Sequence, residues 1–149
     1  MIKKADKIYV SIQALLFILY IIPIKIFQLH IVAVFRYAGI LFSLTGILIA
    51  SIALLQLNKF LTAFPTPKQN SRLLKSGVYK YVRHPVYSGI ILTSTGYGLF
   101  AQDVWKLLIA ASLFILFYFK SKYEESLLLK HFKQYEAYQK NSYRFFPFL

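Results

Sequence analysis

Two short segments hold the side chains whose types and spacing suit chemistry. The first is Gly77–Gly89, in which Arg83 and His84 stand directly before Pro85. Proline disfavours helix in the residue before it and suits a helix's first turn, so we expect a helix to begin at Pro85. Free N–H groups at that helix N-terminus, beside Arg83 and His84, would suit an anion such as a carboxylate or phosphate. The alternative is that Arg83 is an ordinary interfacial cation and His84 a satisfied polar side chain.

The second segment, Lys120–Glu125, ends in two adjacent glutamates, although the whole chain has only 5 acidic residues. Glu124 could pair with Lys120 one turn earlier on an exposed helix, which would contribute little stability. Alternatively, one glutamate hydrogen-bonds the hydroxyls of a ligand or balances its positive charge. The residue types alone leave both interpretations open.

The chain contains no cysteine, which excludes a disulfide framework, a thiolate zinc site and a cysteine nucleophile. With so few carboxylates, a metal site built from them is not expected either. Any chemistry must therefore rely on His, Tyr, Arg, Lys and the two glutamates.

Four apolar runs must position these segments, and 58% of all residues are hydrophobic. A helix that crosses a membrane needs ~20 residues, so the first two runs are convincing and the last two are short. Only Gln102–Asp103 separates the last two, which predicts a helical hairpin whose inner ends extend through Tyr79–Tyr81 and Lys120–Tyr123. Such a hairpin would bring the two segments together in space. The runs are Ile8–Ile24, Tyr37–Leu57, Val86–Ala101 and Val104–Phe119.

The positive charge predicts the orientation of these spans. If the N-terminus is cytosolic, 15 of the 18 Lys and Arg residues lie on the cytosolic side, as the positive-inside rule describes. Orientation thus explains the net charge of +13 without nucleic-acid binding. We expect an all-α, multi-pass integral membrane protein with cytosolic N- and C-termini, in a bacterial or archaeal inner membrane or the endoplasmic reticulum. The cytosolic cations would be Lys3, Lys4, Lys7, Lys59, Lys68, Arg72, Lys75, Lys80, Arg83, Lys120, Lys122, Lys130, Lys133, Lys140 and Arg144.

Two further patterns concern helix packing. Gly89, Thr93 and Gly96 form a strip of small residues that would let a neighbouring helix or a flat ligand approach closely. Leu128, Phe132 and Tyr135 recur at helical spacing, which predicts that the last span continues into a cytosolic helix lying in the membrane interface.

An ordered set of motifs in the second half of the chain resembles the isoprenylcysteine carboxyl methyltransferase family and the related phospholipid N-methyltransferases. The resemblance covers about Ser71–Phe148, whereas the first two spans match only in being spans. The motifs are G-V-Y, R-H-P-x-Y-x-G, E-E-x-x-L, F-x-x-Y-x-x-Y and R-F-x-P, found at Gly77–Tyr79, Arg83–Gly89, Glu124–Leu128, Phe132–Tyr138 and Arg144–Pro147.

The apolar runs predict one membrane domain over residues 1–149 with two N-terminal spans in 8–57, and the resemblance implies a cofactor-binding methyltransferase core in 71–149. It also implies S-adenosylmethionine as the cofactor and no metal. Residues expected to bind the cofactor are Leu73, Leu74, Tyr79, His84, Pro85, Tyr87, Gly89 and Glu124. Those expected to act in catalysis are the cations Arg83 and Lys120 and the candidate proton acceptor Glu125. The family commonly has arginine at the position of Lys120, and lysine can attract a carboxylate but cannot clamp it in a bidentate fork.

Four hypotheses follow for the function. The favoured one is a membrane methyltransferase that esterifies an isoprenylcysteine-like or other lipidic carboxylate, taking its lipidic or prenylated substrate from the bilayer. The second uses the same cofactor and methylates the amine of phosphatidylethanolamine, for which His84, Tyr87 or Glu125 would accept a proton. The third is an NADPH-dependent sterol reductase, a class with a similar R-H-P-x-Y segment, and the fourth is a membrane scaffold without enzymatic activity.

Overall fold

The computed structural model describes residues 3–24, 26, 29–57, 64–66 and 73–147, and these form helices and turns without a β-strand. The predicted all-α class is therefore confirmed for the described part of the chain. Three of the predicted cytosolic cations, Lys59, Lys68 and Arg72, lie outside the described residues. The helices are α1 (Lys4–Ile21), α2 (Ala33–Leu57), the 3₁₀ turn η2 (Gly77–Lys80), α3 (Pro85–Ala101), α4 (Val104–His131) and α5 (Tyr135–Lys140).

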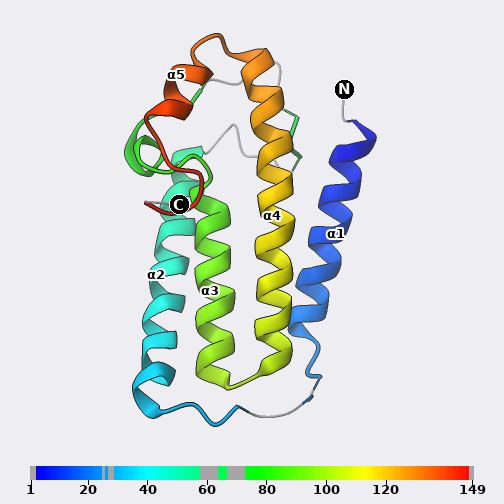
Figure 1. Cartoon of the computed structure of the whole chain (residues 1–149), viewed down its shortest axis with the longest axis vertical. Coiled ribbons are helices and arrows are strands. Elements are labelled where there is room, and N and C mark those ends of the chain that lie inside the picture. Colours follow the sequence, from blue (N-terminus) through cyan, green and yellow to red (C-terminus); the bar gives the residue numbers. More distant parts are fainter. Residues whose placement is uncertain (1–2, 25, 27–28, 58–63, 67–72, 148–149) are drawn as a thin grey trace.

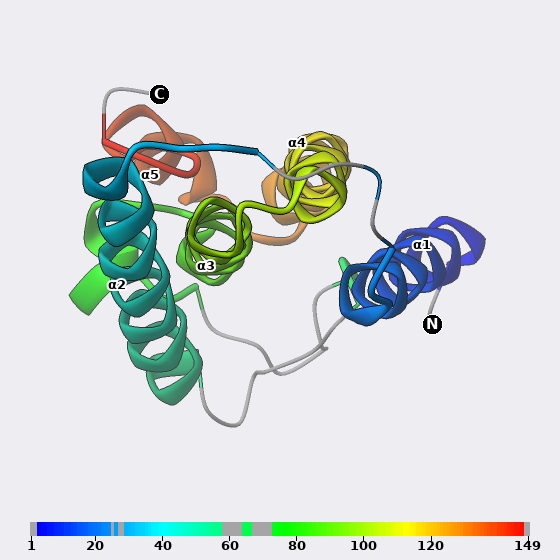
Figure 2. The same cartoon turned by 90° about the horizontal axis from the view of Figure 1, so that it is seen from below.

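The four long helices lie side by side and alternate in direction (Figure 1). Across the bundle the order is α2, α3, α4 and α1, as the view along the helices shows (Figure 2). The chain's N-terminus, the start of α3, the end of α4 and the short α5 all lie at the same end of the bundle (Figure 1). This arrangement brings the two polar segments together, as the predicted hairpin requires.

The hairpin turn between α3 and α4 is as short as predicted. Gln102 ends α3 in the left-handed conformation with φ +56°, and Asp103 caps α4 by accepting a hydrogen bond from Lys106 N at 3.3 Å. Helix α4 extends beyond Tyr123 to His131. The predicted extension of α3 through Tyr79–Tyr81 is wrong, because Pro85 begins the helix and the chain before it forms η2.

Helices α2 and α3 pack against each other through glycines. A Cβ atom on Gly46 would lie only 2.6 Å from Gly89 O and Thr93 N, and one on Gly96 only 2.5 Å from Gly39 O. Glycine at these positions lets the two backbones approach closely. Of the two predicted occupants of the small-residue strip, the neighbouring helix is therefore the one in contact with it.

The predicted interfacial helix through Leu128, Phe132 and Tyr135 is wrong as a continuous element. Phe132 is extended, with φ −123° and ψ 112°, and ends α4, while α5 starts at Tyr135. Tyr135 is buried instead of facing outward. The apolar side chains recur at helical spacing on both sides of the break by chance. This pattern carries no information on the backbone conformation of Phe132, which interrupts the helix.

Helices α2 and α4 are long and apolar enough to cross a membrane. Along α2, Leu41, Leu48 and Leu55 recur every seven residues and are each more than half exposed. A continuous exposed apolar stripe of this kind is typical of a surface that lipid or a partner covers. Helices α1 and α3 have 18 and 17 residues, so the prediction of four spans stays a prediction.

Candidate active site

The C-terminal segment returns to the start of α3 and holds it by backbone hydrogen bonds. Tyr143 N donates to Tyr81 O at 2.9 Å, and Arg83 N donates to Tyr143 O at 2.8 Å. The next residue follows the same register, with His84 N donating to Arg144 O at 3.1 Å. These bonds fix the backbone of the R-H-P segment beside the R-F-x-P motif, so two sequence-distant motifs form one structural unit.

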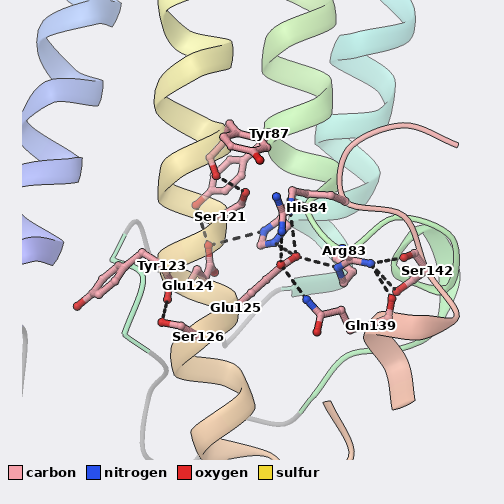
Figure 3. Close-up of polar contacts among 12 residues, drawn as sticks. Arg83, His84, Tyr87, Ser121, Tyr123, Glu124, Glu125, Ser126, Gln139 and Ser142 are labelled. Atoms are coloured by element: carbon pink, nitrogen blue, oxygen red, sulfur yellow. Dashed lines mark hydrogen bonds and ion pairs between the residues drawn. The ribbon is translucent and has the colours of Figure 1, made fainter. Parts of the chain in front are cut away.

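Glu125 lies at the centre of a buried polar network (Figure 3). Its Oε1 accepts from Arg83 Nε at 2.8 Å and its Oε2 from Arg144 Nη2 at 2.7 Å. Gln139 Nε2 donates to Oε2 at 3.1 Å, and His84 Nε2 lies 3.2 Å from Oε1. A buried carboxylate is stable only when cations and donors compensate its charge, and here two guanidinium groups do so. Helix α4 is thereby fastened to α3, α5 and the C-terminal segment.

His84 lies between the two glutamates. Its Nδ1 is 3.7 Å from Glu124 Oε2, while its Nε2 is 3.2 Å from Glu125 Oε1. Because Glu125 acts as an acceptor toward every neighbour, the hydrogen-bond network assigns the imidazole proton to Nε2. In the neutral ring, Nδ1 then carries a lone pair facing Glu124.

Tyr87 contacts Glu124 at the same carboxylate oxygen that faces His84. The tyrosine ring is parallel to His84 at 5.4 Å and to Phe117 at 4.5 Å between ring centroids. Its hydroxyl donates to Glu124 Oε2 at 3.0 Å, and Lys120 Nζ lies 5.4 Å from the ring centroid. These parallel ring contacts limit the rotation of the Tyr87 side chain and keep its hydroxyl directed at Glu124.

The two adjacent glutamates have different environments. The side chain of Glu125 is 4% exposed, whereas that of Glu124 is 25% exposed. Glu125 is thus enclosed by its hydrogen-bond partners, whereas part of the Glu124 side chain remains accessible.

Helix α5 covers the network at its outer edge. Arg83 Nη1 donates to Gln139 O at 3.0 Å and also to the carbonyl of Ser142. Tyr138 OH donates to Tyr79 O at 2.5 Å. Burial raises the pKa of Tyr138 to about 12, so this phenol remains a neutral donor at ordinary pH. Burial alone would lower the pKa of Arg144, but its hydrogen bond to Glu125 raises it.

The phospholipid methyltransferase family model matches residues 34–135 of this chain, which is more than half of it. The chain belongs to the phospholipid methyltransferase family. No curated protein matches it at a significant level. Membership in this family makes the chain a methyltransferase, and together with two apolar helices it indicates association with a membrane. The family resemblance stated from the motifs is confirmed.

The family match covers a different part of the chain from the motifs. The match begins at residue 34 and so includes α2, which the motifs had left outside the resemblance. It ends at residue 135, before Gln139 and Arg144, which donate hydrogen bonds to Glu125. The match favours methyl transfer over the reductase hypothesis.

Five of the predicted site residues contact one another and form one cluster. They are Arg83, His84, Tyr87, Glu124 and Glu125. Pro85 occupies the first turn of α3, as expected. Among the described residues, no group of three or more His, Asp or Glu side chains could hold a metal ion.

Lys120 lies beside this cluster but faces α1. Only 1% of Lys120 is exposed, and its Nζ donates to Gln13 Oε1 at 2.6 Å. The alternative of a surface pair between Lys120 and Glu124 is therefore wrong, since the lysine is not at the surface.

The remaining predicted cofactor residues lie around the cluster. Tyr79 is buried under α5, and Leu73 and Leu74 are half-buried in the segment before η2. Gly89 contacts α2, with a Cβ position 2.7 Å from Ala50 Cβ. The roles of these four residues in cofactor binding stay predictions.

Sequence reasoning missed Arg144 and Gln139 as members of the site. Arg144 had a signal, because it opens the R-F-x-P motif, but nothing in that motif indicates that it reaches Glu125. Gln139 had no signal in the sequence, since it reaches Glu125 only because α5 lies beside the network.

Proposed function

We propose that this methyltransferase transfers a methyl group from S-adenosylmethionine to the amine of a phospholipid headgroup. The observation that carries the proposal is the position of His84 between the buried Glu125 and the partly exposed Glu124. A protonated amine must lose a proton before it can accept a methyl group, whereas a carboxylate needs no such step. A carboxylate and an imidazole lone pair facing one another are the groups that suit proton removal.

The residues present fit the cofactor. A sulfonium and an ammonium are both cationic, and Glu124 is a partly exposed carboxylate that can balance positive charge next to the flat rings of Tyr87 and His84. When bound, S-adenosylmethionine supplies an activated methyl, and the N–CH₃ bond forms as the S–CH₃ bond breaks. The chain then has to orient the amine in line with that methyl and exclude water.

The proton has a defined path in this proposal. Glu124 accepts it from the ammonium. His84 Nδ1 lies 3.7 Å from Glu124 Oε2, beyond direct hydrogen-bond distance, so a bridging water or a closer approach of the two side chains carries the proton on to Nδ1. Glu125 stabilises the resulting imidazolium through Nε2 at 3.2 Å. We therefore assign Glu124 and His84 to proton transfer and reassign Glu125 and Arg83 from catalysis to positioning, because both are fully used in holding the network.

We further propose that the protein spans the membrane four times, with the site at the cytosolic end. The distribution of the described cations supports this, because the predicted cytosolic cations include Arg83, Lys120 and Arg144 at the site's end of the bundle. Arg36 and Lys106, predicted to lie outside, are at the opposite end, where Arg36 donates to Phe100 O and Lys106 approaches Asp103. The cofactor would enter from the cytosol and the phospholipid from the bilayer.

The test is the pH dependence of methyl incorporation into phosphatidylethanolamine by the wild type and by Glu124→Gln. Loss of a general base is expected to slow the variant roughly 100-fold at neutral pH. The rate should partly recover at alkaline pH, where the amine is already deprotonated. The control is Glu136→Gln, at an exposed side chain of α5, which should follow the wild type. A Glu124→Gln enzyme with the wild-type profile would exclude this role.

Carboxyl O-methylation is the second candidate, and Lys120 favours it. This ammonium is buried beside Tyr87 and could attract a carboxylate from the side of α1. If the acceptor is an isoprenylcysteine-like carboxylate, Lys120→Gln should raise KM far more than it lowers kcat. The pH dependence of the methylation rate should then show no step from deprotonation of a headgroup amine.

A further inference from the structure

A second polar site lies between η2 and α5, at the same end of the bundle as the active site. It is a groove of about 440 Å³, and its lining includes Lys75, Lys80, Tyr81, Gln134, Tyr138 and Asn141. Among its described lining residues none is acidic. The groove therefore has a net positive charge that its own walls do not neutralise.

The groups in this groove suit a phosphate. Lys75 Nζ donates to Gln134 Oε1 at 2.8 Å, which places the ammonium and the amide side by side across the two walls. Lys80 Nζ lies 5.7 Å from the centroid of the Tyr81 ring. Ammonium and amide N–H groups are hydrogen-bond donors, and a phosphate oxygen accepts from both.

The position of the groove favours a lipid over a soluble anion. Tyr81 and Tyr143 are exposed tyrosines brought together by the bridge between Val82 and Tyr143. Exposed tyrosines at the end of an apolar bundle are typical of the level of lipid headgroups. Basic pockets at this level on the cytosolic side of membrane proteins bind anionic headgroups.

We propose that this groove binds the phosphate of an anionic phospholipid from the surrounding leaflet, at a site separate from that of the methyl acceptor. Lys75 and Lys80 attract the phosphate and would repel the ammonium of a zwitterionic headgroup. The proposal rests on the proposed membrane orientation and not on the identity of the methyl acceptor.

The site is connected to the active site through Tyr138. This residue lines the groove, its hydroxyl donates to Tyr79 O, and its carbonyl accepts from Ser142 Oγ at 2.6 Å. Ser142 in turn accepts from Arg83. A lipid bound in the groove would therefore stabilise the position of α5 over the glutamate network.

The test is calorimetric titration of the full chain in a neutral detergent with short-chain phosphatidylglycerol. At about 1 kcal/mol for each lysine near the headgroup, the double variant Lys75→Gln/Lys80→Gln should bind roughly 25-fold more weakly. The matched control is Lys130→Gln/Lys133→Gln, which removes the same charge from exposed lysines outside the groove and should bind like the wild type. The variant Lys75→Arg/Lys80→Arg keeps the charge and should keep the affinity.

Three results would overturn the proposal. The first is equal weakening in the control pair, which would mean a diffuse electrostatic effect. The second is equally tight binding of short-chain phosphatidylcholine. The third is displacement of the lipid by inorganic phosphate at the same concentration, which would assign the groove to a soluble anion. Methyl incorporation is measured separately, so failure of this proposal leaves the proposed reaction intact and the reverse also holds.

Discussion

Replacing Glu125 with glutamine should destabilise the protein far more than any other Glu→Gln substitution in the chain. The amide keeps the size of the side chain but removes the charge that compensates Arg83 and Arg144, which bind it at 2.8 and 2.7 Å. Removing one partner of a buried ion pair costs about 3–5 kcal/mol, because the other charge stays buried without compensation. Since the Arg144 side chain remains 20% exposed and can be hydrated, we expect the lower end, about 3 kcal/mol.

Thermal unfolding of the detergent-solubilised protein measures this effect. For a chain of this size, a loss of about 3 kcal/mol corresponds to a decrease in Tm of about 6–12 °C. Glu136→Gln is the matched control, because Glu136 also accepts from a cation, Lys140 at 2.9 Å, but both side chains are exposed. Its Tm should equal that of the wild type. If the Glu125 and Glu136 variants melt at the same temperature, the network around Glu125 does not hold the fold as argued.

Three further predictions follow from single contacts. Gly46→Ala should lower Tm measurably, because the new Cβ would meet the backbone of α3 at 2.6 Å, whereas Ser51→Ala on the exposed face of α2 should not. The wild type should lose stability as the pH rises from about 10 to 12, and Tyr138→Phe should reduce this loss. Unfolding measured as a function of alkaline pH tests it. The unfolded phenol ionises near pH 10, whereas burial raises the native pKa to about 12, so deprotonation favours the unfolded chain in that range. Tyr87→Phe keeps the stacked ring but removes the donor to Glu124, and it should slow methyl transfer about fivefold at saturating substrate. An unchanged kcat would exclude a role for that hydroxyl.

Features encoded by a few neighbouring residues were predictable from the sequence. Pro85 fixes the start of α3 because its ring disfavours helix at His84, and the two residues Gln102–Asp103 leave room only for a tight turn. These two local features suffice to bring the segments of Arg83 and Glu125 together. The predicted proximity of the two polar segments was therefore correct without knowledge of the packing.

Features that depend on the return of the C-terminal segment were not predictable. Adjacent glutamates in a sequence look equivalent, and contacts such as those of Glu125 with Arg144 and Gln139 distinguish this buried carboxylate from the partly exposed Glu124. The break of α4 at Phe132 was missed for a related reason. Burial of Tyr135 beneath the bundle end overrides the helical periodicity that links it to Leu128.

The central claim is that the acceptor is a phospholipid amine, and a competition between acceptors tests it most directly. Purified protein is incubated with methyl-labelled S-adenosylmethionine and vesicles that contain phosphatidylethanolamine and a prenylcysteine analogue in equal amounts, and the lipids are then separated. Label is expected in phosphatidylethanolamine with the wild type and with Glu136→Gln, and it should be lost with Glu124→Gln at neutral pH. Label that appears in the prenylcysteine analogue and not in phosphatidylethanolamine would contradict the central claim.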